Sequence, residues 1–222
     1  MSCNGNPFSA ANNYGYGFGQ QQCCNGGGGA RGASGATGAR GPPGAPGAGA
    51  IIPFASGVFG TMSSLVSGLV STGTLVGFGT NMPSVSLLGG TIDLAPLLPV
   101  IVNEAFVVPR ASTITSLAAS FTVTAGVALL PTQTATVHAQ LYLAPAGSVV
   151  FSPIPTAFVN LGPGFNNVLN IAPGNTVSGI NSVINVPVVA GDKLLLVFSV
   201  TSSPGLLIGA LSGIMSAGVA MS

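Results

Sequence analysis

Charged side chains are the scarcest feature of this sequence. Lys, Arg, Asp and Glu make up 3% of the 222 residues, against about a quarter in an ordinary globular protein. The formal net charge is +1, and the few charges are scattered along the chain. Because phosphate contacts need clustered Lys and Arg, this composition excludes nucleic acid as a partner. The surface must instead be covered by Ser, Thr, Asn, Gly and backbone.

Groups that could catalyse a reaction or hold a metal ion are equally scarce. The acids and the single histidine are Asp93, Glu104, Asp192 and His138. No two acids lie within ten residues of each other, so a calcium site is not expected. No G-x-S-x-G motif provides a serine nucleophile. We therefore expect a protein that is not an enzyme and has no cofactor and no metal site.

The titratable residues of the C-terminal region have structural interpretations. His138 shares a strand face with Gln140 and Tyr142. Catalysis would need a base and an orienting partner at one site, so we expect a hydrogen-bonded or interface histidine. Glu104 and Arg110 lie six residues apart and could form an ion pair near a subunit interface.

Cysteine is absent from most of the chain. Cys3, Cys23 and Cys24 all lie near the N-terminus, which excludes a disulfide framework for the apolar remainder. A bridge between the adjacent Cys23 and Cys24 would strain the backbone. An odd number of cysteines in one arm favours disulfides between chains; free thiols are the alternative, and metal binding is less favoured than either.

The sequence also lacks a signal peptide and a convincing membrane span. Its N-terminus has neither a basic region nor an apolar stretch, so we expect synthesis without a signal peptide. Hydrophobic residues make up 47% and the mean hydropathy is +0.70. However, the uncharged segment 205–222 is interrupted by Gly and Ser and has no basic flank, so no membrane span is expected.

What the chain does contain begins with a low-complexity arm, residues 1–28, rich in Asn, Gly and Gln. Four aromatic residues at near-alternate positions are candidate docking anchors: Phe8, Tyr14, Tyr16 and Phe18. They would allow the arm to add to another subunit as an extended strand. The alternative is a solvated tail.

A strict period of three follows in residues 29–49, a collagen-like Gly-X-Y stalk. Its glycines are Gly29, Gly32, Gly35, Gly38, Gly41, Gly44 and Gly47. Only glycine fits at the axis of three wound polyproline-II chains, so this run predicts a collagen triple helix. The run is too short to hold three chains together unaided, because ordering three strands costs more entropy than a few triplets return. The following domain must therefore bring the chains into register.

Residues 50–222 predict an all-β head. Apolar and polar residues alternate in 113–124, 137–143 and 194–200, as expected for half-buried strands. Turn signals separate such stretches at Pro145–Gly147, Gly162–Gly164, Pro173–Asn175 and Gly191–Asp192. Many short strands at this spacing indicate a sandwich or a jelly roll.

The stretch 193–200 is apolar on both strand faces, which implies a second buried surface. An obligate oligomer interface would supply that surface. Because a triple helix enters the domain, the oligomer is expected to have three-fold symmetry.

Four blocks of the head resemble the BclB-type exosporium glycoproteins of spore-forming bacteria. They are IIPFASG at 51–57, TLVGFGTNMPSVSLLGGTIDL at 74–94, FVVPRASTITSLAASF at 106–121 and VPVVAGDKLLLVFSVT at 186–201. The blocks occur in order and follow a collagen-like run, as in that family. The resemblance implies a trimeric C1q/TNF-like jelly roll on the spore surface. It also implies threonine-linked glycans on the stalk, for which Thr37 is the candidate acceptor.

Together these features predict a structural subunit of a spore-surface layer or appendage fibre. The subunit would be a collagen-stalked homotrimer that associates with further trimers, or attaches to other spore-coat proteins, through its arm. The alternative is an adhesive or ligand-binding C1q-like module on the spore surface. The head has no Trp and few charges, whereas adhesive surfaces favour aromatic and Arg hot spots, so the structural role is favoured.

Overall fold

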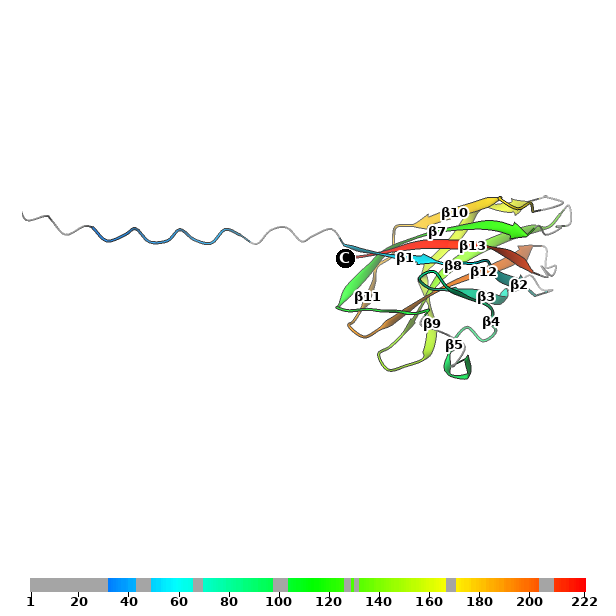
Figure 1. Ribbon diagram of the computed structural model, residues 1–222, viewed down its shortest axis with the longest axis horizontal. Helices are drawn as coiled ribbons and strands as arrows, with labels where there is room; N and C mark the ends of the chain where they lie inside the picture. The colour runs from blue at the N-terminus through cyan, green and yellow to red at the C-terminus, as the bar shows by residue number, and fades with distance from the viewer. Residues whose placement is uncertain are drawn as a thin grey trace, which may run out of the picture. The chain divides into compact units, whose positions relative to one another are not determined.

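The structure, a computed structural model, describes residues 32–42, 49–65, 70–97, 104–125, 129, 132–166, 171–203 and 210–222. Contacts between residues divide the chain into two units, Met1–Ala45 and Pro46–Ser222. Residues 32–42 of the first unit run as an extended chain without regular secondary structure, and all of them are exposed (Figure 1).

The second unit is built of β-strands, which confirms the all-β prediction. The strands are β1 (Ala50–Ala55), β2 (Gly60–Ser64), β3 (Val70–Val76), β4 (Asn81–Ser86), β5 (Ile92–Asp93), β6 (Phe106–Val107), β7 (Ser112–Ala125), β8 (Thr134–Ala144), β9 (Val150–Asn166), β10 (Thr176–Asn181), β11 (Val186–Val188), β12 (Lys193–Ser203) and β13 (Leu211–Met221). A short 3-10 helix, η1 (Ala95–Leu97), follows β5.

These strands pair antiparallel in one sheet that forms a nearly closed ring (Figure 1). The hydrogen-bonded order is β1-β13-β2-β3-β12-β8-β9-β10-β7-β11, and a further pairing joins β13 to β7. Strand β13 therefore has β1 along part of its length and β7 along nearly all of it, while its first residues pair with β2. The ring brings β1, β13, β7 and β10 together on one side and β3, β12, β8 and β9 on the other.

One hydrophobic core fills the space between the two sides of the ring. From β7 it receives Leu117, Ala119, Phe121 and Val123, the alternate residues predicted from the sequence, and each is at most 5% exposed. Strand β12 contributes Leu194, Leu196, Phe198 and Val200, which are all fully buried. Alternation with period two thus predicted correctly which face of each strand packs inward.

Three of the four predicted turns are confirmed, and one is wrong. Gly147 and Gly174 lie in turns with positive φ, which suits glycine, and the amide of Val189 donates to Asp192 Oδ2 across 2.9 Å in the turn before β12. Residues 162–164 instead lie within β9. There Val137 pairs with Leu161 but Ala135 pairs with Phe165, so β9 carries extra residues opposite β8. Gly and Pro mark a bulge at this point, where a missing N–H is tolerated.

The apolar outer face of β12 is covered by the same chain, which corrects the inference that an oligomer interface must cover it. Leu195 and Val197 point away from the main core, yet they are 0% and 1% exposed. They belong to a second hydrophobic cluster with Val85 on β4, Ile92 on β5 and Leu94. The segment from β4 to β5 folds back over this face, so these two residues need no second subunit.

Candidate functional site

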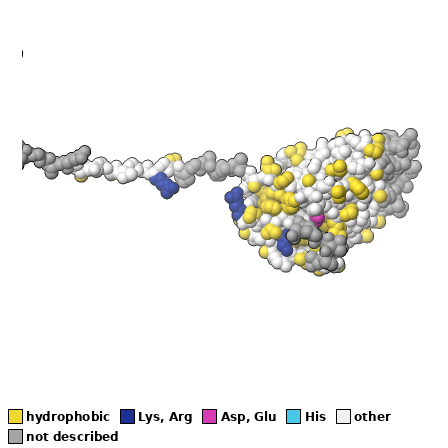
Figure 2. Space-filling view, in the orientation of Figure 1, with side chains coloured by type: hydrophobic (Ala, Val, Ile, Leu, Met, Phe, Trp, Pro, Cys, Tyr) yellow, Lys and Arg dark blue, Asp and Glu magenta, His cyan; other side chains and the backbone are white. Residues whose placement is uncertain are grey.

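The outer face of β1, β13, β7 and β10 has no covering element among the described residues. The four strands run side by side in Figure 1, and Figure 2 shows the unit in the same orientation. Hydrophobic side chains are interspersed with neutral ones there, and charged side chains appear at few points. Each strand buries its alternate residues in the core and leaves the others on this face.

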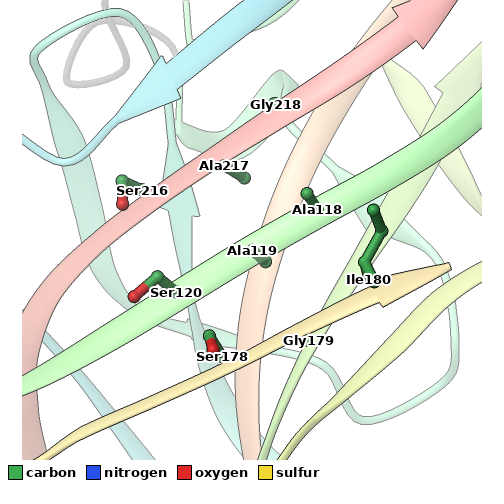
Figure 3. Close-up of a pocket in the computed structure, with 9 residues that line it drawn as sticks. All are labelled: Ala118, Ala119, Ser120, Ser178, Gly179, Ile180, Ser216, Ala217 and Gly218. Carbon is green, nitrogen blue, oxygen red and sulfur yellow. The ribbon is translucent and has the colours of Figure 1, made fainter.

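Small residues align in rows across the centre of this face. Ser120 on β7 pairs with Ser178 on β10 and with Ser216 on β13, so three serines lie next to one another (Figure 3). In the adjacent row Ala118 pairs with Ile180 on one side and Gly218 on the other. The rows form a shallow trough of about 490 Å³. We call this surface the small-residue face.

The small side chains of this face are not required by packing or hydrogen bonding within the chain. A Cβ atom at Gly218 would have its nearest neighbour, Ile51 Cγ2, at 3.9 Å, so larger side chains would fit there. Within the described part of the chain, the hydroxyls of Ser120, Ser178 and Ser216 have no hydrogen-bond partner. A flat strip of this kind lets another polypeptide approach closely.

Apolar side chains stand beside the trough. Ile51 on β1 is 75% exposed, Ile180 on β10 is 71% exposed and Ile214 on β13 is 48% exposed. The nine residues that line the trough include no titratable side chain. This combination suits packing against another protein surface. Apolar contacts and hydrogen bonds from the hydroxyls can stabilise the association, and no charged group has to be desolvated.

The stalk residues that the structure describes are exposed. No atom comes within 4 Å of a Cβ atom built on Gly32, Gly35, Gly38 or Gly41, so the single chain itself does not require glycine there. In a collagen helix, the prediction from the sequence, glycine would be needed at these positions for contacts between chains. Thr37, the candidate glycan acceptor, is exposed as well.

Several predicted site residues lie outside the described residues. They are Cys3, Cys23 and Cys24, the arm anchors Phe8, Tyr14, Tyr16 and Phe18, and the stalk glycines Gly29, Gly44 and Gly47. Disulfide formation and arm docking therefore remain predictions from the sequence.

His138 is a hydrogen-bonded residue, as expected. Its Nδ1 lies 2.6 Å from Asn160 Oδ1 and its Nε2 lies 2.7 Å from Thr201 Oγ1. We assign the proton to Nδ1, because Asn160 Oδ1 can only accept, so Nε2 accepts from the hydroxyl of Thr201. Burial lowers the pKa of His138, partly offset by the hydrogen bond to Asn160. The imidazole is therefore a neutral, fixed ring.

The suggested ion pair between Glu104 and Arg110 does not form. Glu104 is 4% exposed and accepts a hydrogen bond from Thr80 Oγ1 at 3.2 Å, whereas Arg110 is exposed. The two side chains therefore lie in different environments. Burial raises the pKa of Glu104, since solvation of its charged form is lost.

The remaining acids do not assemble a site with their neighbours. Asp93 accepts a hydrogen bond from the amide of Ala95 at 2.9 Å, and Asp192 binds the turn before β12. Within the described ranges, no three His, Cys, Asp or Glu side chains come close enough to hold a metal ion. Nor does that part of the chain include a helix with the length and hydropathy to cross a membrane.

Comparison with known proteins identifies a viral relative of this chain. No family model matches the chain. Collagen-like protein 1 of Acanthamoeba polyphaga mimivirus is 30% identical over 180 residues, covering 78% of this chain. Residues 1–49 are less than a quarter of the sequence, so most of the match lies in the β-rich unit rather than in the Gly-X-Y run. The chain spans about a fifth of the relative's length, 19%. This chain is thus distantly homologous, over most of its own length, to a viral collagen-like protein.

Proposed function

We propose that this protein is a structural subunit of a bacterial spore-surface layer or appendage fibre, with no enzymatic activity. It assembles as collagen-stalked homotrimers that are linked through the N-terminal arm, either to one another or to other spore-coat proteins. The observation that carries the proposal is the small-residue face, uncharged and without a partner, on a unit that follows a Gly-X-Y run. Homology to a collagen-like protein over most of the chain supports the structural role.

We infer three copies because a collagen helix has three chains, and because the single chain does not itself require glycine at Gly32, Gly35, Gly38 and Gly41. The β-rich units must hold these chains in register, and the small-residue face is the surface they offer for it. A trimer in which each copy presents this face to its neighbour buries Ile51, Ile180 and Ile214, which are exposed in the single chain.

The head is proposed to be a C1q/TNF-like jelly roll. Its strand pairing supports this assignment, since β1, β13, β7 and β10 oppose β3, β12, β8 and β9 across one core. Eight strands in two facing sheets are the arrangement of a jelly roll. The placement on the spore surface, and a glycan on Thr37, rest on the resemblance of the four sequence blocks to BclB-type proteins.

The mass of the assembly tests this proposal. Native mass spectrometry of residues 29–222, which lack the arm, and of residues 50–222 is expected to give three times the monomer mass in both cases. Immunogold labelling of sectioned spores is expected to place the protein on their surface. A monomeric head at micromolar concentration would contradict the trimer, and labelling only within the spore core would contradict the surface role.

An adhesive or ligand-binding module is the second candidate function. The observation that favours it is a hollow beside His138, on the opposite side of the ring from the small-residue face.

A further inference from the structure

The outer face of β12 changes character along its length. At Leu195 and Val197 it is apolar and covered by the segment from β4 to β5. At Ser199 and Thr201 it becomes polar, and with the neighbouring strands it borders a hollow of about 380 Å³. Volumes of this size are typical of sites for small ligands.

Two stacked rings bound this hollow on the β8 and β9 side. The imidazole of His138 and the ring of Phe158 are stacked, with centroids 5.1 Å apart and an interplanar angle of 26°. Hydrogen bonds to both ring nitrogens fix His138 in this orientation. Such a wall offers a preformed surface for the apolar face of a ring-shaped ligand.

Two buried hydroxyls in the hollow have no partner. Tyr142 is 6% exposed and Ser199 is 9% exposed, and neither hydroxyl makes a hydrogen bond in the described part of the chain. Both hydroxyls nevertheless keep contact with solvent, because no buried side-chain oxygen there is unsatisfied. Burial raises the pKa of Tyr142, so its phenol stays protonated and remains a donor.

An amide completes the polar groups. Gln140 Nε2 donates to the carbonyl of Ile154 across 3.3 Å, which orients the amide and leaves its oxygen as an acceptor. The hollow thus combines hydroxyl donors, an amide acceptor, a stacked aromatic wall, and the apolar side chains of Val70 and Leu87.

None of the lining residues carries a charge. The eight are Val70, Leu87, His138, Gln140, Tyr142, Phe158, Ser199 and Thr201. A charged ligand would lose its hydration without gaining a counter-charge, which is costly, whereas a neutral ligand rich in hydroxyls can exchange water for these groups. The chemistry therefore selects a neutral polar ligand with one apolar face.

We propose that this hollow binds one ring of a neutral carbohydrate. The C–H face of the sugar lies against Phe158, and its hydroxyl groups bond to Tyr142, Ser199 and Gln140. This inference goes beyond the structural role and does not depend on it.

Saturation-transfer NMR with the full chain tests the proposal. The probes are the methyl glycosides of glucose, galactose, mannose and N-acetylglucosamine, with glucuronic acid and glucosamine as charged counterparts. At least one neutral glycoside is expected to bind with a Kd on the order of 10 mM or tighter, as suits a single ring. Charged counterparts are expected to bind roughly tenfold more weakly.

Three variants locate the binding. Tyr142→Phe and Ser199→Ala each remove an unpartnered hydroxyl, so the fold is retained, and each is expected to weaken binding roughly tenfold. Ser178→Ala removes an exposed hydroxyl on β10, on the opposite side of the ring from the hollow, and is expected to bind as the unaltered protein does. Absence of binding by all four neutral glycosides, or binding by both hollow variants as tight as that of the unaltered protein, would overturn the proposal.

Native mass spectrometry of the same variants separates this proposal from the trimer. If Tyr142→Phe or Ser199→Ala changes the oligomeric state, the hollow is part of a subunit contact and the carbohydrate site is refuted. If the protein is monomeric and binds the glycosides, the carbohydrate site is supported and the trimer is refuted.

Discussion

Glu104 accepts a hydrogen bond from Thr80, with 3.2 Å between the two oxygen atoms, in a place that Gly77 keeps open for the carboxyl group. A Cβ atom at residue 77 would collide with Glu104 Oε2. The carboxyl group is thus enclosed and, among the described residues, has one neutral partner and no cation. That arrangement makes the ionised form of Glu104 a cost to the folded state.

The first prediction is that Glu104→Gln stabilises the protein at neutral pH. Burial raises the pKa in the folded state, so this group's contribution is fully present below its ordinary value of 4.5 and is lost as pH rises through the raised folded value. The amide keeps a hydrogen bond to Thr80 without ionising. Urea unfolding between pH 4 and 8 should show a growing advantage of the variant as pH rises. A constant difference over this range would contradict a buried, ionising Glu104.

The second prediction concerns His138, whose pH dependence has the opposite sign. Its folded-state pKa is lowered by burial, so its contribution is fully present above the ordinary value of 6.5 and is lost as pH falls toward the lowered folded value. Replacing it by Gln retains hydrogen-bonding groups but removes the titration. The unfolding free energy of the unaltered protein should therefore fall relative to His138→Gln below pH 6.5. Parallel pH profiles would show that His138 titrates alike in both states.

The third prediction is that Gly213→Ala destabilises the β-rich unit by about 2 kcal/mol, through overpacking. A Cβ atom at residue 213 would overlap the ring of Phe121 and the carbonyl of Thr122. The cost should shrink in the background of Phe121→Leu, because the smaller side chain vacates the space. Thermal unfolding of the two single variants and the double variant measures this coupling. Additive effects would mean that the ring of Phe121 does not limit residue 213.

The strands were predictable from the sequence where one face packs and the other does not. In β7 and β12 the inward residues recur with period two, which the pleat of a strand imposes directly. The bulge at Gly162–Gly164 could not be predicted from the sequence, because Gly and Pro occur both in turns and in interrupted strands. The cover over Leu195 was missed for a different reason. It comes from β4 and β5, distant in sequence, and strand periodicity carries no information on which segment covers a face.

Part of the small-residue face could be predicted from the sequence. Ser116, Ala118 and Ser120 alternate with core residues of β7, so their outward position follows from the pattern. Their alignment with Ser178 and Gly218 could not be derived, because it depends on the pairing of strands far apart in the chain. Small outward residues also look the same in a sequence whether they face water or another subunit.

The fourth prediction tests that face with a matched pair of substitutions. Ser178→Arg places a long charged side chain in the row of serines and is expected to convert the trimer to monomers, since an unpaired charge would be buried. Ser86→Arg makes the same change at an exposed serine on β4 and should leave the trimer intact. Sedimentation velocity of residues 50–222 distinguishes the two. If both variants remain trimeric, the subunits associate through another surface.

The fifth prediction is that the N-terminal arm links trimers into fibres and that its cysteines lock the linkage. Contact between the arm of one trimer and the head of another is heterologous, and such contacts propagate into filaments when they do not close into a ring. Alternating aromatic residues at 8–18 supply anchors for strand addition, and a disulfide would make the docked state resistant to dissociation.

Electron microscopy of the full chain should show fibres that are absent after deletion of residues 1–28. Replacement of Cys3, Cys23 and Cys24 by serine should leave fibres that dissolve in denaturant, whereas those of the oxidised protein persist. If the protein forms identical fibres without residues 1–28, the arm does not link trimers, and its role is limited to anchoring the protein on a different partner.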